Sequence, residues 1–227
     1  MSSVPMAVLA SIATESMKDA DPANDIFHAE LAIRIAKALC EREGADFKIV
    51  NAALLIHNIA PRKRIDDRVT DYRTDSIQKG RDVLLKVGFP HSSVQEILSC
   101  VEAAYFGNEA KAVSIEAKVV HDANKLVTMG ALAIARTFAY GGYFRRPIYD
   151  PQNSLIRSSE DILHPQNAEY DPYAINLDSI SHFRTKLLHI KDTMLTNTGR
   201  KLAERRHEFM IQFLDQFFDE LNADIKR

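Results

Sequence analysis

Three polar side chains fall on apolar helical stripes of the sequence, and together they could carry metal or acid–base chemistry. His28, His57 and Asp122 each follow apolar residues at spacings of three or four, which places them on inward faces. A lone inward histidine is more often a core residue than a ligand, but a buried carboxylate without a partner costs several kcal/mol. Asp122 is therefore predicted to pair with the histidines in one cluster. The apolar neighbours are Leu31, Ile35 and Leu39 for His28, Val50, Ala53 and Leu54 for His57, and Ile115, Val119 and Leu126 for Asp122.

Such a cluster suits a divalent metal, because imidazole nitrogens and carboxylates bind Mn, Mg, Fe or Zn. Asn58 follows His57, and an aspartate there would make a metal-binding dyad. The predicted ligands are His28, His57, Asn58 and Asp122, with the amide as a neutral and weaker donor. A metal held this way polarises a phosphoryl oxygen and activates a water molecule. Without a metal, the same histidines and carboxylate could act as an acid–base relay.

Cations beside this cluster would bind a phosphate. Lys125, Arg145 and Arg146 are the candidates for that role. His121 falls in register with Lys118 and Lys125, so it is predicted to face solvent.

The elements that must position these residues are predicted to be helices. Apolar residues recur at helical spacing almost throughout, alternation with a period of two is nearly absent, and only 8 residues are glycine. The pattern indicates an all-α fold, one compact domain over residues 1–227, and a long irregular excursion over 141–172, which is a candidate lid. The predicted helices are 4–17, 26–43, 46–57, 75–87, 92–104, 113–126, 128–139, 179–195 and 198–221.

Composition limits the functional classes. Hydrophobic residues make up 46% and charged residues 26% of the chain, as in soluble globular proteins. A net charge of -2 argues against nucleic-acid binding. No stretch approaches the roughly 20 apolar residues of a membrane span, and the first residues lack the basic start of a signal peptide. Two cysteines, Cys40 and Cys100, lie in apolar stretches and are predicted to be reduced core thiols of a cytoplasmic protein.

The last predicted helix carries an apolar stripe, which is expected to be core or a homodimer face. Its residues are Leu202, Phe209, Phe213, Phe217 and Leu221.

The arrangement of His28, then His57-Asn58, then Asp122 resembles the HD superfamily of metal-dependent phosphohydrolases. It is most similar to the branch of single-domain bacterial-type enzymes, over most of residues 24–221. The resemblance implies an all-helical fold, a divalent metal and nucleotide pyrophosphohydrolase or phosphodiesterase activity. It rests on residues 43–60 (EGADFKIVNAALLIHNIA), 120–151 (VHDANKLVTMGALAIARTFAYGGYFRRPIYDP) and 180–217 (ISHFRTKLLHIKDTMLTNTGRKLAERRHEFMIQFLDQF).

The departures from this branch all remove a charge or a ligand. Asn58 stands where the branch has the aspartate of the dyad. Three functions stay open: weak hydrolysis of nucleotides or small phosphoesters, a catalytically silent protein that binds a ligand or partner, and a metal-free isomerase, lyase or cyclase. The other departures are Asn24, Ser76 and Ala104 in place of histidine, Leu31 in place of arginine, and Asn124 and Val127 in place of aspartate.

Overall fold

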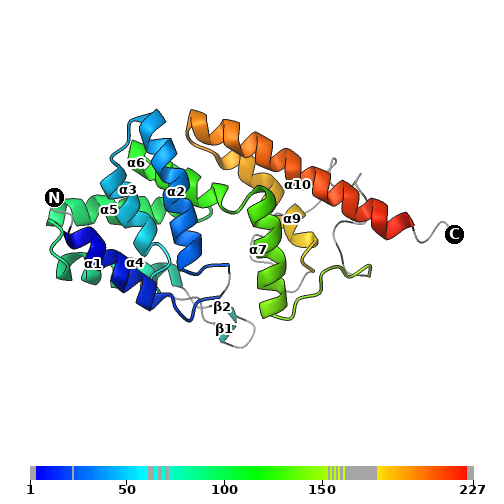
Figure 1. Ribbon diagram of the computed structural model, residues 1–227, viewed down its shortest axis with the longest axis horizontal. Coiled ribbons are helices and arrows are strands. Elements are labelled where there is room, and N and C mark those ends of the chain that lie inside the picture. The colour runs from blue at the N-terminus through cyan, green and yellow to red at the C-terminus, as the bar shows by residue number, and fades with distance from the viewer. Residues whose placement is uncertain are drawn as a thin grey trace. The chain divides into compact units, whose positions relative to one another are not determined.

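Helices make up the regular structure of the described residues, apart from one short hairpin (Figure 1). In that hairpin β1 (Arg64–Ile65) pairs antiparallel with β2 (Arg68–Val69). The all-α prediction is confirmed. The computed structural model describes residues 4–21, 23–60, 64–65, 68–69, 72–152, 154, 156, 158, 161 and 178–223.

The chain divides into two compact units, each with its own helices. The first comprises residues 1–127 and 194–199, and the second comprises 128–193 and 200–227. The prediction of a single domain stays a prediction.

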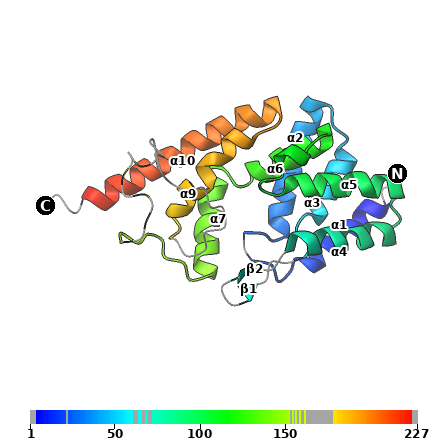
Figure 2. The ribbon, with the colours of Figure 1, turned by 180° about the vertical axis from the view of Figure 1, so that it is seen from behind.

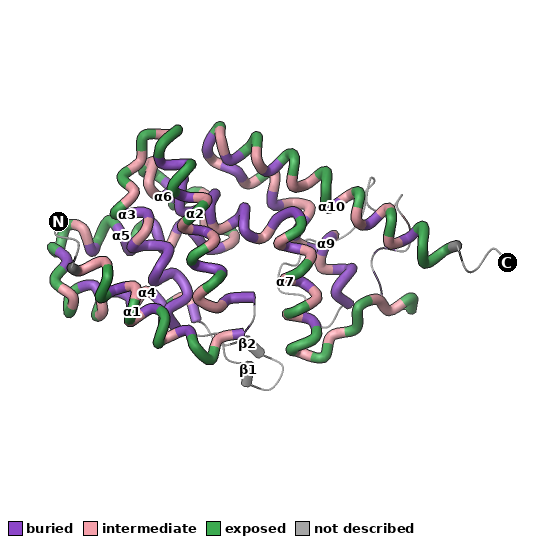
Figure 3. The backbone as a smooth tube through the Cα atoms, in the orientation of Figure 1, coloured by how far each residue is buried: buried purple, intermediate pink, exposed green. Residues whose placement is uncertain are grey.

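In the first unit, α6 packs against α2 and α5, and α3 packs against α2, α5 and α6. Figures 1 and 2 show these four helices grouped together, and Figure 3 shows that buried residues recur along them. The unit's helices are α1 (Val4–Ser16), α2 (Ile26–Glu43), α3 (Phe47–Ile56), α4 (Tyr72–Lys86), α5 (His91–Ala104), the 3-10 turn η1 (Glu109–Lys111) and α6 (Ile115–Leu126).

Capping residues fix where α2 and α3 begin, and thereby where the two histidines lie. The Asp25 side chain accepts the His28 N–H at 3.0 Å, which places His28 in the first turn of α2. Gly44 ends α2 with φ 76°, a left-handed conformation that favours glycine. Asp46 caps α3, and His57 is the residue that ends it.

The second unit contains α7 (Gly130–Tyr143), α9 (Ser181–Thr185), the 3-10 helix η2 (Leu187–Thr193) and most of α10 (Asn197–Ala223). Aromatic rings of these helices pack together. The Phe183 and Phe213 rings are stacked with centroids 5.8 Å apart, and the Phe138 ring lies 6.5 Å from that of Phe183.

The apolar stripe of α10 is displaced from the predicted one. Phe209 is 47% exposed and Leu221 is 37% exposed, so the core role was wrong for these two residues, and the homodimer face stays a prediction. The displacement by one position arises because several apolar residues flank the face, and periodicity alone does not choose among neighbours. The buried apolar side chains of α10 are Ala203, Met210, Leu214 and Phe218.

Three predicted helices are interrupted or depart from their predicted bounds by more than two residues. Tyr72 begins α4, so Asp75 lies within its first turn and does not cap it. The single helix predicted over 179–195 is divided into α9 and η2 at Lys186, whose φ of -145° is not helical. Helix α7 continues to Tyr143, and much of the rest of the predicted excursion lies outside the described residues.

Glycine is needed at one position in the last turns of α7. A Cβ at Gly141 would lie 2.5 Å from the Ser179 Oγ, so the close approach of these two residues excludes a side chain.

No helix among the described residues is both long enough and apolar enough to cross a membrane.

Candidate functional site

The turn that carries His57 and Asn58 is held by side chains from the helices around it. The Tyr105 hydroxyl donates to the His57 carbonyl at 2.8 Å. Lys79 donates to the carbonyl of residue 59 at 3.1 Å, and the Ser76 Oγ accepts the N–H of residue 60 at 3.1 Å. Because backbone groups at a helix end otherwise lack partners, these bonds fix the geometry of the turn.

Within the first unit, two histidines and two asparagines form a hydrogen-bonded group, which we call the amide–imidazole cluster. The Nε2 atoms of His28 and His57 lie 3.2 Å apart. The Asn58 Nδ2 lies 2.9 Å from the His57 Nε2, and the Asn124 Oδ1 lies 3.0 Å from the His28 Nε2. His28 and His57 are 4% and 1% exposed, so the two imidazoles are shielded from bulk water.

The hydrogen bonds assign a proton to each ring. The His57 Nδ1 donates to the Leu54 carbonyl at 2.7 Å, which leaves its Nε2 as an acceptor in the neutral imidazole. That nitrogen accepts an N–H from the Asn58 amide. The His28 Nε2 then carries a proton directed at two acceptors, the His57 Nε2 and the Asn124 Oδ1. This arrangement is that of a neutral His57 imidazole, and neither amide of the cluster adds a charge.

Helix α6 supplies Asn124 and also caps the end of α5. The Asn124 Nδ2 and the Lys125 Nζ both donate to the Ala104 carbonyl, at 3.0 and 3.2 Å. The His121 Nδ1 donates to the preceding carbonyl, that of Ala103, at 3.0 Å. These acceptors belong to the last turn of α5, where carbonyls lack helical partners and the helix dipole favours a cation.

This capping overturns the prediction that His121 and Lys125 face solvent. Their exposed fractions are 0% and 5%. The Lys125 ammonium also lies over the Phe106 ring, 4.5 Å from its centroid, a favourable position for a cation. Burial, and then the charge of Lys125, lower the pKa of His121.

Asp122 was predicted to pair with the histidines, but its carboxylate hydrogen bonds elsewhere. Its Oδ1 accepts the Leu195 N–H at 2.9 Å, and its Oδ2 accepts the Thr196 N–H at 2.8 Å and the Thr196 hydroxyl at 2.6 Å. Burial raises the pKa of the Asp122 carboxyl, and these three bonds oppose that rise. The structure thus brings His28 and His57 together, as predicted, and joins Asn124 rather than Asp122 to them by hydrogen bonds.

Gly199 lies against Asp122, so Gly199→Ala is expected to destabilise the protein by about 1–3 kcal/mol. A Cβ at this position would stand 2.2 Å from the Asp122 Oδ2. Gly142→Ala in α7 is the control, because a Cβ there meets nothing within 4 Å and alanine favours a helix. Thermal or urea unfolding of both variants tests this, and equal stabilities would contradict it.

The remaining predicted phosphate-binding residues belong to the second unit. Arg145 is exposed and has φ 55°, and the half-buried Arg146 guanidinium lies 5.7 Å from the centroid of the Tyr140 ring. A phosphate-binding role for Arg145, Arg146 and Lys125 stays a prediction.

Asn124 is the residue of the cluster that helical periodicity failed to select. In the sequence it stands out only as an asparagine in place of a family aspartate. The signal was available, because Val120 and Val127 stand four residues before and three after it, and both are fully buried. Asn24, another departure, lies outside the cluster's hydrogen bonds, since its Nδ2 donates to the Asp21 carboxylate at 2.9 and 3.0 Å.

The cluster does not fit a tightly held divalent metal. Its two imidazoles and two amides supply no negative charge, and amide oxygens are weak ligands. The lone pair of the His57 Nε2 accepts the Asn58 N–H, so a metal would have to displace that bond. Among the residues that the structure describes, no group of three or more His, Cys, Asp or Glu side chains is arranged to hold a metal.

Comparison with known proteins supports the fold. No protein-family model matches the chain. An uncharacterized Bacillus subtilis (strain 168) protein, YpgQ, is 29% identical over 204 residues, which cover 88% of this chain and 85% of YpgQ. The crystal structure of YpgQ in complex with ADP has a TM-score of 0.68 and 27% identity, covering 97% of this chain and 94% of that one.

Two further crystal structures have the same fold. An HD-superfamily hydrolase from Bacillus thuringiensis has a TM-score of 0.67 and 29% identity, covering 96% of this chain and 97% of its own. A Lactobacillus plantarum protein has a TM-score of 0.77 at 22% identity, covering 98% and 99% of the two chains. The fold of this chain is therefore like that of the HD-superfamily hydrolases.

Proposed function

We propose that this protein is an HD-like nucleotide-binding protein in which metal-dependent hydrolysis is weak at most. The observation that carries the proposal is the hydrogen bond from the Asn58 amide to the His57 Nε2. This bond places an N–H donor against the nitrogen through which His57 would bind a metal. The proposal keeps the nucleotide or small-phosphoester ligand expected from the sequence, and it favours a binding protein over an active hydrolase.

The chemistry of the cluster supports weak hydrolysis. A divalent metal acts by polarising a phosphoryl oxygen and by making a bound water acidic, and neutral donors hold such an ion poorly. Neither carboxamide can take a proton from water in place of a carboxylate. Metal-dependent hydrolysis at this cluster is therefore expected to be weak at most.

The likeness to YpgQ supports a nucleotide ligand, because YpgQ has been crystallised with ADP. The buried Lys125 ammonium adds a positive charge at the residue next to Asn124. A cation in a shielded position attracts phosphate more strongly than one in bulk water. Asn124 itself is half-buried, and its amide is a neutral hydrogen-bonding group that a ligand could contact.

The test is a calorimetric titration of the purified protein with ADP, once with EDTA and once with Mn²⁺, beside a phosphate-release assay on ADP and ATP. We expect the same dissociation constant in both titrations, and phosphate release no faster with Mn²⁺ than with EDTA. Asn124→Ala should weaken ADP binding about 10-fold, which corresponds to the loss of about one hydrogen bond.

Asn51→Ala provides the matched control, since Asn51 is a half-buried asparagine of α3 with no cluster bond. Turnover that requires Mn²⁺ and is lost with EDTA would overturn the proposed weak hydrolysis. Failure to bind ADP and ATP would overturn the proposed ligand class.

A further inference from the structure

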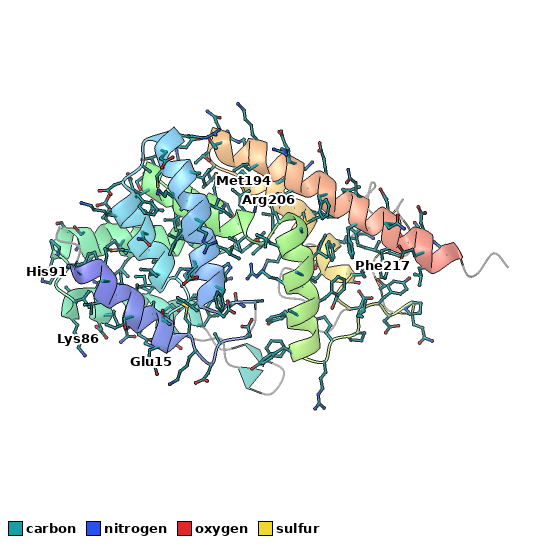
Figure 4. All side chains as sticks on the ribbon, viewed as in Figure 1. Glu15, Lys86, His91, Met194, Arg206 and Phe217 are labelled. Carbon is teal, nitrogen blue, oxygen red and sulfur yellow. The ribbon has the colours of Figure 1, made fainter. Side chains whose placement is uncertain are left out.

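Asp122 is fully buried and uses both carboxylate oxygens on one short segment, residues 194–199, which we call the return segment. Along the chain, this segment belongs to the first unit and stands between two parts of the second. Met194, its first residue, is labelled in Figure 4. Asp122 accepts the N–H groups of Leu195 and Thr196 and the Thr196 hydroxyl. The carboxylate thus holds the segment in one geometry.

Other contacts complete this attachment. The Thr196 Oγ1 also accepts the Gly199 N–H at 2.9 Å, as a helix N-cap does at the start of α10. Glu43 of α2 accepts the Thr198 N–H at 2.8 Å. Glu43 and the Thr196 hydroxyl therefore accept N–H groups of the first turn of α10, and Asp122 accepts the two N–H groups just before it, where negative charge is favourable.

The glycine in this first turn fits the same arrangement. Glycine inside a helix costs about 1 kcal/mol relative to alanine. A Cβ at Gly199 would overlap the Asp122 carboxylate. The bonds that this carboxylate makes to the return segment therefore depend on the glycine, and they offset its cost in the helix. The absence of a Cβ lets the carboxylate approach the helix start.

The last turns of α6 are consequently held by two sets of bonds. Asp122 binds the return segment, whereas Asn124 binds His28 and the Ala104 carbonyl. Residues two apart on a helix point to nearly opposite sides, so the two sets fix the helix from both directions. Release of the Asp122 bonds would free α6 to shift relative to His28.

We infer that Asp122 is a positioning residue, which anchors the return segment to α6 and thereby sets the contact between Asn124 and His28. This role differs from the metal-ligand or catalytic role expected from the sequence. It does not depend on the proposed nucleotide binding, since the bonds lie within the ligand-free chain.

The test uses the full-length, ligand-free protein labelled with ¹⁵N. Asp122→Asn removes the charge and places an amide N–H₂ against N–H donors. We expect hydrogen exchange at Leu195, Thr196 and Gly199 to become at least about 10-fold faster, the equivalent of about one lost hydrogen bond. The imidazole ¹⁵N resonances of His28 should also shift, because these report its hydrogen bonding.

Glu43→Gln is the matched control, because it touches the same segment from α2. It should alter exchange at Thr198 and leave the His28 resonances unchanged. If Asp122→Asn speeds exchange without moving the His28 resonances, Asp122 is structural only and the inference fails. Unchanged exchange also overturns it.

Thr196→Val covers the case in which Asp122→Asn does not fold. It removes the hydroxyl bond to Asp122 and the cap on the Gly199 N–H, and leaves the two backbone bonds to Asp122. A smaller change of the same pattern at Leu195 and His28 would support the positioning role. No change at either site would refute it.

Discussion

Replacing both amides of the cluster with carboxylates, Asn58→Asp together with Asn124→Asp, is expected to create a site that binds one Mn²⁺ or Zn²⁺ ion. The two Nε2 atoms are 3.2 Å apart. Two nitrogens bound to one metal at about 2.0–2.1 Å, with an angle between about 90 and 109°, would have a similar separation. What the cluster lacks is charge, and each substitution supplies one negative charge.

The expected gain in affinity is large. Opposite unit charges about 4 Å apart interact by about 4 kcal/mol at an effective dielectric constant near 20. Each carboxylate should therefore strengthen metal binding by more than about 100-fold, and the metal should raise the melting temperature of the double variant. Without metal, the variant should be less stable than the natural protein, because an aspartate oxygen would face the acceptor nitrogen of His57.

Metal analysis after dialysis and thermal unfolding with Mn²⁺, Zn²⁺ or EDTA would measure both effects. Asn51→Asp is the control, since it adds a charge to the half-buried face of α3 without joining the cluster. Stoichiometric metal in the natural protein would show that neutral donors suffice. A double variant that binds no metal would show that the amides are not what prevents binding.

Most of the helical fold could be predicted from the sequence because capping residues and apolar spacing agree. Helix α2 has the predicted bounds, with Asp25 before it and Gly44 after it. The segment after 179 was harder, because its composition favours a helix while the observed chain interrupts one at Lys186. Tertiary packing overrides local propensity at such positions.

The site could be predicted only in part, for a physical reason. Periodicity identifies the side chains that point inward, and it correctly selected both histidines and Asp122 as buried residues. It does not reveal which inward residue meets which, because that depends on the rotation of α6 about its axis. Asn124 reaches His28, while Asp122 meets a backbone segment more than 70 positions later in the chain.

His121 should make the protein less stable as the pH falls below the ordinary histidine pKa of 6.5. Burial, followed by the nearby charge of Lys125, lowers its pKa in the folded state. Between the unfolded and folded pKa values, the unfolded chain binds a proton that the folded chain excludes. Stability is therefore lost as the pH falls through this interval, by up to about 1.4 kcal/mol per pH unit.

His121→Asn is the variant that isolates this effect, because an asparagine can still donate to the Ala103 carbonyl but does not titrate. Urea unfolding from pH 7.5 to pH 5.0 should show a steeper loss of stability for the natural protein than for the variant. His91→Asn, at an exposed position of α5, controls for the substitution itself.

Asp122 acts in the opposite direction, because burial raises its pKa, and its protonation favours the folded state as the pH falls. The natural protein and His121→Asn both contain Asp122, so subtracting one stability curve from the other removes the Asp122 effect that they share. If the two curves of stability against pH were parallel, a neutral, buried His121 would be contradicted.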